Sequence, residues 1–261
     1  MFDAKILADS IHPNGSRLTS FELTYPRFIH SELMTHRKFS RNSASSRAIP
    51  TRVLLKQIED NPVIPIHWGK LQSGMQAYEE LSPEDQEACK AEWLEARDNT
   101  LRSVQRLYNL KLHKQIVNRL LEPWMWITVV LTSDERGLAN WYKLRNHEAA
   151  EPHIQKLAKM MLGAHAWSTP RHLNFGEWHM PFSDDVKVSV ARCARGSYLQ
   201  QHGDFTVEED VALHTRMSGM GHWSPFEHSA LVTDLPRLGG NFVDGWYQYR
   251  KMFVGEHGCG A

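Results

Sequence analysis

The chain has 261 residues with ordinary hydrophobic and charged fractions, and its 30 Lys and Arg residues balance 30 Asp and Glu residues. No overall field therefore attracts a nucleic acid or an anionic membrane, and an anion site must be local. The start of the chain does not resemble a signal peptide, no run has the length of a membrane span, and Cys89, Cys193 and Cys259 are not at metal-ligand spacing, so we expect a reduced cytoplasmic protein without a metal.

The first predicted elements are a strand and a short helix that lead into a basic loop. Residues 17–27 alternate between apolar and polar side chains up to Pro26, which predicts a strand with one buried face. Apolar residues near helical spacing over 27–37 predict a short helix. The stretch MTHRKFSRNSASSRAIP, residues 34–50, contains almost nothing to bury after Phe39 and predicts a polar loop.

The middle of the chain is predicted to be mostly helical. Ser82 is a good N-cap and Pro83 suits the first helical position, so a long helix follows them. Residues 62–76 are punctuated by Pro and Gly and should be irregular, and the buried run 125–131 fits either a strand or a helix. Helices are predicted over 49–62, 81–110, 113–124, 133–148 and 151–167.

The C-terminal third of the sequence contains both strand-like alternation and helical periodicity. Residues 168–182 are the best candidate connector, and 186–200 alternate as a strand does before a turn at Gly196. A capping box at Thr206 and Glu209 starts a helix over 205–221. A turn and strand are expected over 222–236, and 241–258 resemble a second unit of helix and basic loop.

One faint internal repeat is visible. A strand, a Pro-Arg pair, a helix and a basic tail occur at 17–41 and again, loosely, at 229–251. The matching positions are Pro26-Arg27 with Pro236-Arg237, and His36-Arg37-Lys38 with Tyr249-Arg250-Lys251.

The basic loop has the side chains of an anion site. Arg gives bidentate charge-assisted hydrogen bonds to phosphate, and Ser, Asn and backbone N–H groups complete a cradle. The alternative is a solvated loop with surface arginines. Nucleic-acid binding through residues 34–52 is disfavoured by the zero net charge and the lack of a basic helix.

The spacing within this loop resembles the signature of the flavin-dependent thymidylate synthases. That signature is Arg-His-Arg, seven residues, Ser, and an Arg two positions on. Here it reads Thr35-His36-Arg37, KFSRNSA, Ser45-Ser46-Arg47.

Four further segments are similar to motifs of the same family. RLLEP (119–123) resembles the Arg-x-x-x-Pro element of the family. TSDERGLANWYKLR (132–145) resembles a helix of the family with the pattern Thr-x-Asn-x-Arg-x-Leu-x-Asn-x-x-x-Leu-Arg. ARCARGSY (191–198) resembles Ala-Arg-x-Ser-Phe, and GHWSPFEH (221–228) resembles Gly-His-Glu-Thr-Pro-Phe-Glu-His. In the family the last two elements precede the signature, whereas here they follow it. The chain therefore looks circularly permuted, and 246–258 look like a decayed second copy of the signature unit.

The resemblance implies a fold, cofactors and partners. We expect an α+β protein with a central mixed sheet flanked by long helices, and one domain over 1–261, made of a signature and helical part (1–167) and a sheet part (183–261). The family implies FAD as cofactor, with NADPH and methylenetetrahydrofolate as co-substrates, in the conversion of dUMP to dTMP. It also implies a homo-oligomer, a tetramer or a dimer, whose partner is a small nucleotide and neither a nucleic acid nor a membrane.

The resemblance also implies residue roles. Reading of the family motif onto this sequence assigns catalysis to Ser45, Arg47 and Arg145. Nucleotide binding is expected at Ser45, Ser46, Arg47, Arg119 and Arg145. Flavin binding is expected at His36, Arg37, Ser40, Asn42, Ser43, Asp134, Arg136, Asn140, Ser197, Ser224 and Glu227.

Three positions depart from the family pattern. Thr35 stands where the family has Arg, Ser43 where it has Glu, and Asp134 where it has Asn. Exchanged hydrogen-bonding groups in a buried pocket change which base is read. The alternatives are therefore another pyrimidine nucleotide such as dCMP, hydroxymethyl transfer, or a paralogue that only binds nucleotide or flavin.

Overall fold

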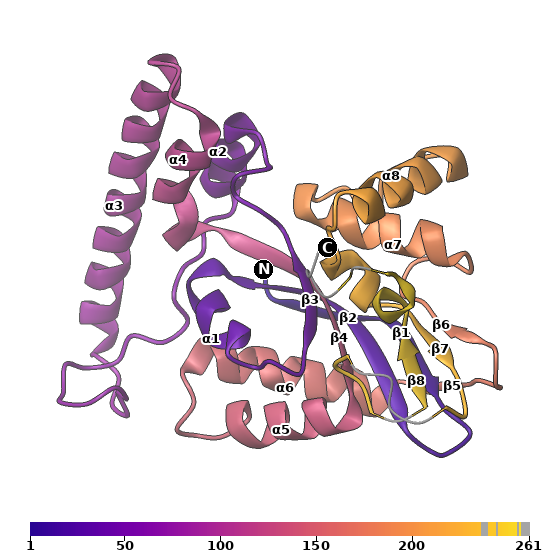
Figure 1. The fold of residues 1–261 in the computed structure, drawn as a ribbon. Helices are drawn as coiled ribbons and strands as arrows, with labels where there is room; N and C mark the ends of the chain where they lie inside the picture. The colour runs from indigo at the N-terminus through magenta and orange to yellow at the C-terminus, as the bar shows by residue number, and fades with distance from the viewer. Residues whose placement is uncertain (236–239, 244, 255, 257–261) are drawn as a thin grey trace.

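The computed structural model describes residues 1–235, 240–243, 245–254 and 256. Within these residues a mixed five-stranded sheet forms the centre of the molecule, in the order β3-β4-β2-β1-β5, with β5 parallel to β1 and the other pairs antiparallel (Figure 1). Its strands are β1 Asp3–Ile11, β2 Arg17–Pro26, β3 Ser40–Ser43, β4 Trp126–Asp134 and β5 Arg171–His172. The expected α+β class with a mixed central sheet is confirmed.

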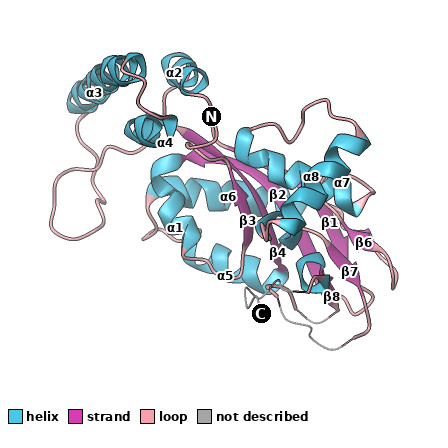
Figure 2. Ribbon diagram, turned by 45° about the horizontal axis from the view of Figure 1, so that its top comes forward, coloured by secondary structure: helices cyan, strands magenta, loops and turns pink. Residues whose placement is uncertain are grey.

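The two central strands show why the sheet forms here. The predicted strand β2 is present, although both of its faces are largely buried, and it pairs with β4 in unbroken register from Leu18 opposite Asp134 to Pro26 opposite Trp126. β4 lies between β2 and β3 and is buried on both faces, which explains why its apolar run was ambiguous in the sequence. Figure 2 shows the helices gathered on both sides of this sheet.

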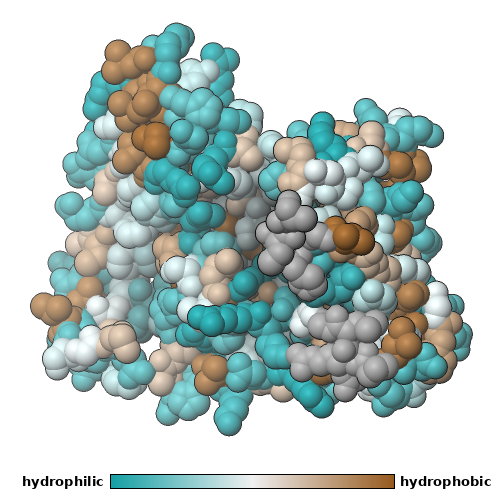
Figure 3. Space-filling model, viewed as in Figure 1, coloured by the Kyte–Doolittle hydropathy of each residue, from teal (hydrophilic) through white to brown (hydrophobic). Residues whose placement is uncertain are grey.

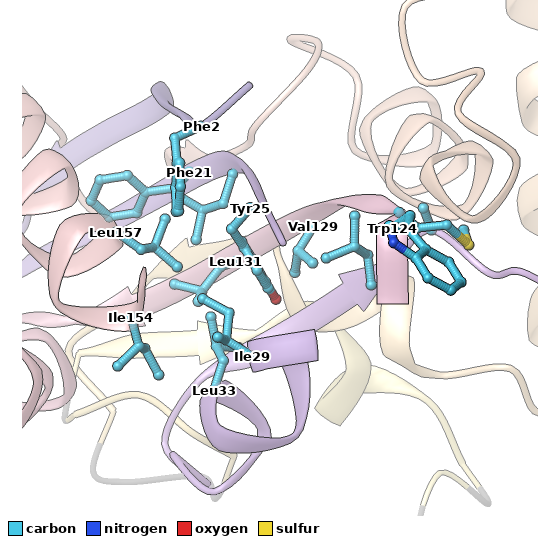
Figure 4. Close-up of a cluster of buried hydrophobic side chains, with 14 of the residues drawn as sticks. Phe2, Phe21, Tyr25, Ile29, Leu33, Trp124, Val129, Leu131, Ile154 and Leu157 are labelled. Atoms are coloured by element: carbon cyan, nitrogen blue, oxygen red, sulfur yellow. The ribbon is translucent and has the colours of Figure 1, made fainter. Parts of the chain in front are cut away.

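One face of the sheet carries the main hydrophobic core. Phe21 and Tyr25 of β2 and Leu131 of β4 point to this side, where they meet Leu33 and Leu157 (Figure 4). Removing such apolar surface from water contributes most of the folding free energy. The covering elements are η1 Arg27–Ile29, α1 His30–Met34, α5 Glu135–Arg145 and α6 Pro152–Trp167.

The opposite face carries the C-terminal third. Among the described residues a second sheet of three strands has the order β6-β7-β8, and it packs on Leu18 with two helices beside it. The elements are β6 Trp178–His179, α7 Val186–Arg195, η3 Gly196–Tyr198, α8 Val207–Gly219, η4 Ser224–Glu227, β7 Ala230–Val232, β8 Trp246–Gln248 and η5 Tyr249–Met252.

A buried hydrogen-bond chain joins the two sheets. The hydroxyls of Ser20 and Thr132 are 2.5 Å apart, Ser20 is 2.8 Å from His179 Nε2, and Thr132 is 2.9 Å from His228 Nδ1. His179 Nδ1 is hydrogen-bonded to Ser10 at 2.9 Å. Burial lowers the pKa of both imidazoles to about 3, so both are neutral and serve as hydrogen-bonding bridges.

A helical tower stands at one end of the sheet. It consists of α2 Thr51–Asp60, α3 Pro83–Asn109, α4 Lys114–Val117 and η2 Asn118–Trp124. The predicted cap is confirmed, because Ser82 accepts a hydrogen bond from Asp85 N. In the space-filling view the tower rises beside the α7–α8 part with a notch between them (Figure 3). No helix among the described residues is both long and apolar enough to span a bilayer.

Three local predictions differ from the structure. Residues 186–195 form α7 and not a strand, because Asp185 caps them and Val190, Ala191 and Ala194 give a buried helical face. The polar loop contains the short strand β3, which is stabilised by pairing with β4. The segment 241–258 contains β8 and the 3-10 turn η5 where a helix was expected. Pro236, Arg237 and Cys259 lie outside the described residues.

Candidate active site

The short strand β3 connects the signature segment to the C-terminal third. Asn42 is buried, its amide donates to the carbonyl of Cys193 at the end of α7, and its Oδ1 accepts from the Ser224 hydroxyl at 3.1 Å. Ser40 is fully buried, and its hydroxyl accepts from the amides of Gln248 and Asn241, each at 3.1 Å. One strand thus contacts segments about 150 to 200 residues away in the sequence.

The chain after β3 continues the same arrangement. Ser45 N donates to the carbonyl of Ser197 at 3.0 Å, which brings together two residues expected to serve nucleotide and flavin. The Ser46 hydroxyl is nearly inaccessible and donates to Glu122 Oε1 at 2.7 Å. Arg47 is exposed, and its guanidinium has no hydrogen bond or ion pair within the described ranges.

Glu122 organises the next cluster and was not singled out from the sequence. Besides Ser46, its Oε1 accepts from Arg119 at 2.9 Å and from Arg27 at 3.3 Å. Asn118 on the same turn donates to the backbone carbonyls of Ser46 and Ile49 and so holds the loop. The signal was present, because Glu122 lies within the RLLEP element that pointed to Arg119.

A second cluster surrounds Arg145 at the end of α5. Arg145 Nε donates to His36 Nε2 at 2.9 Å, while Nη1 lies 3.4 Å from Glu32 Oε2 and Nη2 lies 3.3 Å from Thr35 Oγ1. His36 must therefore be neutral with its proton on Nδ1. Its ring packs edge-on against Trp141, with ring centroids 4.7 Å apart.

The chemistry of His36 follows from this environment. Burial is the largest cause that lowers the pKa of His36, to about 4, and the positive charges of Arg145 and Arg41 lower it further. The imidazole is thus an acceptor that orients Arg145 at neutral pH. No hydrogen bond or ion pair among the described residues joins Arg145 to Arg119 or Glu122, although both arginines were expected at the nucleotide.

The beginning of α5 presents free cations. Asp134 caps the helix through Oδ1, which accepts from Gly137 N at 2.8 Å, while its buried Oδ2 has no partner in the described structure. A Cβ at Gly137 would lie 3.4 Å from Lys38 Cβ, so this turn abuts the signature segment. Arg37, Arg136 and Asn140 are exposed, with no hydrogen bond or ion pair to any described residue.

The remaining expected flavin residues are placed differently. The Glu227 carboxylate accepts from Arg250, and its carbonyl accepts from the Gln248 amide at 3.0 Å. Ser43 lies on β3 and makes no side-chain hydrogen bond within the described part of the chain. Among the described residues, Glu227 therefore binds the segment 246–258, for which the sequence predicted a decayed second copy of the signature.

Comparison with known proteins follows this geometry. The family model of the thymidylate synthase complementing protein matches residues 18–170, more than half of the chain. The elements ARCARGSY and GHWSPFEH lie beyond the matched residues. No curated protein matches the sequence.

Two solved structures give the level of structural similarity. A UMP/dUMP methylase PolB from Streptomyces cacaoi, bound with 5-Br dUMP, is 20% identical with a TM-score of 0.49, over 57% of this chain and 67% of that chain. The flavin-dependent thymidylate synthase ThyX from Helicobacter pylori, complexed with FAD and dUMP, is 19% identical with a TM-score of 0.43, over 57% and 67%.

Proposed function

Because the chain belongs to the thymidylate synthase complementing protein family, the flavin-dependent thymidylate synthases, we propose that it uses FAD to transfer a one-carbon unit to a pyrimidine nucleotide. The proposed reaction is methylation of dUMP to dTMP with methylenetetrahydrofolate and NADPH. The observation that supports it best is the assembly around β3, where Asn42 meets Ser224 and Ser45 meets Ser197. Residues that the family motifs assign to one site are thereby adjacent despite their altered order.

The chain has groups that fit FAD. A dinucleotide cofactor carries a pyrophosphate, which binds at helix N-termini and beside arginines. Arg37 and Arg136 are exposed, and neither has a polar partner in the described part of the chain, where the signature turn abuts the first turn of α5. Asn140, one helical turn further on, is also free to hydrogen-bond the cofactor. FAD, when bound, supplies the hydride chemistry of the reaction.

The nucleotide phosphate has a separate set of groups. Arg47 is exposed and has no hydrogen bond or ion pair to a described residue, and Arg119 is half-exposed and shares Glu122 with Ser46. These cations and the Ser45 hydroxyl suit a phosphate monoester, because arginine makes bidentate charge-assisted hydrogen bonds to phosphate. Glu122 offsets only part of the positive charge of the cluster, which stays cationic before the phosphate binds.

The base is assigned to Arg145. A guanidinium beside the pyrimidine carbonyls stabilises the negative charge that develops on the ring when C5 is activated. The 2.9 Å hydrogen bond to His36 holds Arg145 in one orientation, so little reorganisation is needed during the reaction. Burial raises the pKa of the Cys193 thiol, so this cysteine does not supply a thiolate nucleophile.

We extend the proposal to the organisation of the chain. Residues 1–167 and 183–261 act as parts of one permuted domain, in which β7, β8 and η5 derive from a second copy of the signature unit. The family order of motifs and the contacts of β3 support this origin. Exposed apolar residues at the upper end of the tower, Leu110, Ile116 and Leu120, suit a subunit interface in a homo-oligomer.

The direct test is an assay with purified protein, FAD, NADPH, methylenetetrahydrofolate and dUMP. We expect dTMP to form only when all components are present, and Arg145→Ala to abolish it while the protein stays folded. Formation of a modified cytosine nucleotide from dCMP instead would establish the alternative reaction. No product from either nucleotide by FAD-loaded protein would contradict the proposed function.

A further inference from the structure

A cavity adjoins the Arg145 cluster and is walled by a segment that no motif covers. Its volume is about 590 Å³, within the range of small-ligand sites. One wall is formed by Glu32, Arg145 and the start of α6, and the other by residues 75–78 of the irregular segment between α2 and α3.

The outer wall is held in place by its own hydrogen bonds. His67 Nε2 is hydrogen-bonded to the carbonyl of Ala77 at 2.9 Å, and His67 Nδ1 lies 3.0 Å from Glu80. Gln76 donates to the carbonyl of Ala149 at 2.9 Å and joins this wall to the α5–α6 connection. Hydrogen bonds within the protein therefore hold the outer wall opposite Glu32 and Arg145.

The inner wall presents one donor and one acceptor side by side. Arg145 is fixed by its 2.9 Å bond to His36, but its contacts to Glu32 and Thr35, at 3.4 and 3.3 Å, are long for hydrogen bonds. The terminal nitrogens of Arg145 and the Glu32 carboxylate thus retain capacity to bind a ligand. Both side chains are partly exposed, 22% for Arg145 and 38% for Glu32.

We propose that Glu32 is a specificity-determining residue that reads an N–H donor on the edge of the pyrimidine while Arg145 reads the neighbouring acceptor. This inference rests on the proposed function, because it takes Arg145 to bind the base. A uracil offers N3–H beside two carbonyls, and a cytosine offers its N4 amine beside N3. Both edges match a carboxylate next to a guanidinium, and neither matches a guanidinium alone.

The environment of Glu32 suits this role. Burial is the largest cause that raises the pKa of Glu32, the charge of Glu151 raises it further, and the charges of Arg145 and His153 oppose this shift. An N–H donor from a ligand would favour the ionised form by hydrogen-bonding it. Binding should therefore stabilise the carboxylate, and affinity should decrease where the carboxyl becomes protonated.

The test is calorimetric titration of FAD-loaded protein with dUMP, dCMP and N3-methyl-dUMP. Glu32→Ala should lower the affinity for the preferred nucleotide by about 10- to 100-fold, which is the range for the loss of a hydrogen bond to a charged group. A selective loss for dUMP identifies N3–H as the donor, and a selective loss for dCMP identifies the N4 amine. N3-methyl-dUMP lacks the uracil donor, so its affinity should not change by more than a few fold.

Two further variants separate recognition from loss of structure or charge. Glu32→Gln keeps an acceptor oxygen and should restore part of the affinity. Glu148→Ala removes another carboxylate from the same cavity without touching Arg145 and should show no selectivity between the three ligands. Thermal unfolding of each variant checks that it is folded.

Two results would overturn the inference. Equal losses for all three nucleotides would mean that Glu32 only positions Arg145, and unchanged affinities would mean that it does not face the base. A different result, in which no pyrimidine nucleotide binds the unaltered FAD-loaded protein, would refute the proposed function itself.

Discussion

At the scale of single residues, Asn42 joins the two halves of the candidate site. Its amide donates to the carbonyl of Cys193 at the end of α7 in a buried contact, and its Oδ1 accepts from the hydroxyl of the exposed residue Ser224. A small apolar residue here would remove the buried hydrogen bond to the Cys193 carbonyl.

We expect Asn42→Ala to lower the free energy of unfolding by about 1–3 kcal/mol, which is the cost of unsatisfied buried polar groups. Chemical denaturation measures this. Ser43→Ala, on the same strand but without a side-chain hydrogen bond in the described structure, is the matched control and should change stability by less than about 0.5 kcal/mol. Equal effects of the two variants would contradict the bridging role of Asn42.

The exposed cations beside the first turn of α5 make a second prediction. Arg37→Ala and Arg136→Ala should each weaken FAD binding by about 10-fold or more without lowering the melting temperature, because neither side chain has a protein partner among the described residues. Lys143→Ala, two turns along the same face of α5, is the control. Fluorescence titration of apoprotein with FAD gives the affinities, and a uniform small loss in all three variants would point to a non-specific effect of charge.

At the scale of elements, caps and hydrophobic periodicity predicted most of the helices. They did not predict a strand whose formation depends on pairing with another strand. The capping box at Thr206 and Glu209 is present as predicted, and so is the cap at Ser82. By contrast, β3 is a polar segment that becomes a strand only because β4 offers an unpaired edge. The alternation over 186–195 was misleading because Asp185 caps a helix that buries six of its ten residues.

The hydrogen-bond chain between the sheets makes a prediction for β4. Thr132→Val should remove the bridge to His228 and Ser20 and destabilise the protein by about 1–3 kcal/mol, since all three groups are buried. Thr128→Val, on the same face of β4, breaks only a partly buried 3.3 Å contact with Thr24 and should cost less. If denaturation curves show a larger loss of stability for Thr128→Val than for Thr132→Val, the buried hydrogen bonds of Thr132 do not stabilise the packing of the two sheets.

At the scale of the whole molecule, motif spacing indicated the family, but several contacts of the site were beyond sequence reasoning. The signature and the helix that ends at Arg145 could be predicted because each is a pattern within one continuous segment. The partnership of Ser46 with Glu122, and that of Arg145 with Glu32, depend on how distant segments pack, and local spacing carries no information about it. The proposed change in the order of the motifs rests on the sequence alone, whereas the contacts that β3 makes with the C-terminal third could be seen only in the structure.

The buried histidines set a prediction for pH. Burial lowers the pKa of His179 and His228 to about 3 and is the main cause that lowers those of His30 and His36 to about 4, while the unfolded value is about 6.5. Between these values the unfolded chain binds more protons, so the free energy of unfolding should fall as the pH drops from 6.5 toward 3 and be flat just above 6.5.

Thermal unfolding across this range checks the sign. The melting temperature should fall steadily below pH 6.5, and His228→Asn, which keeps a polar group near Nδ1, should show a shallower slope. Asp9, whose pKa is lowered by its hydrogen bonds to Arg17 and Ser168 despite opposing burial, acts only below about pH 4 and does not account for a loss at pH 5. A constant melting temperature from pH 7 to pH 4.5 would contradict the assignment of neutral buried imidazoles.

The measurement that tests the central claim most directly is the absorption spectrum of the purified protein, reconstituted with FAD if necessary and titrated with dUMP and dCMP. The account predicts flavin absorption that one of these nucleotides perturbs in a saturable way, because residues proposed to bind the flavin and the nucleotide are neighbours around β3. A protein that binds no flavin after reconstitution would contradict the enzymatic account and leave only the fold in common with the family.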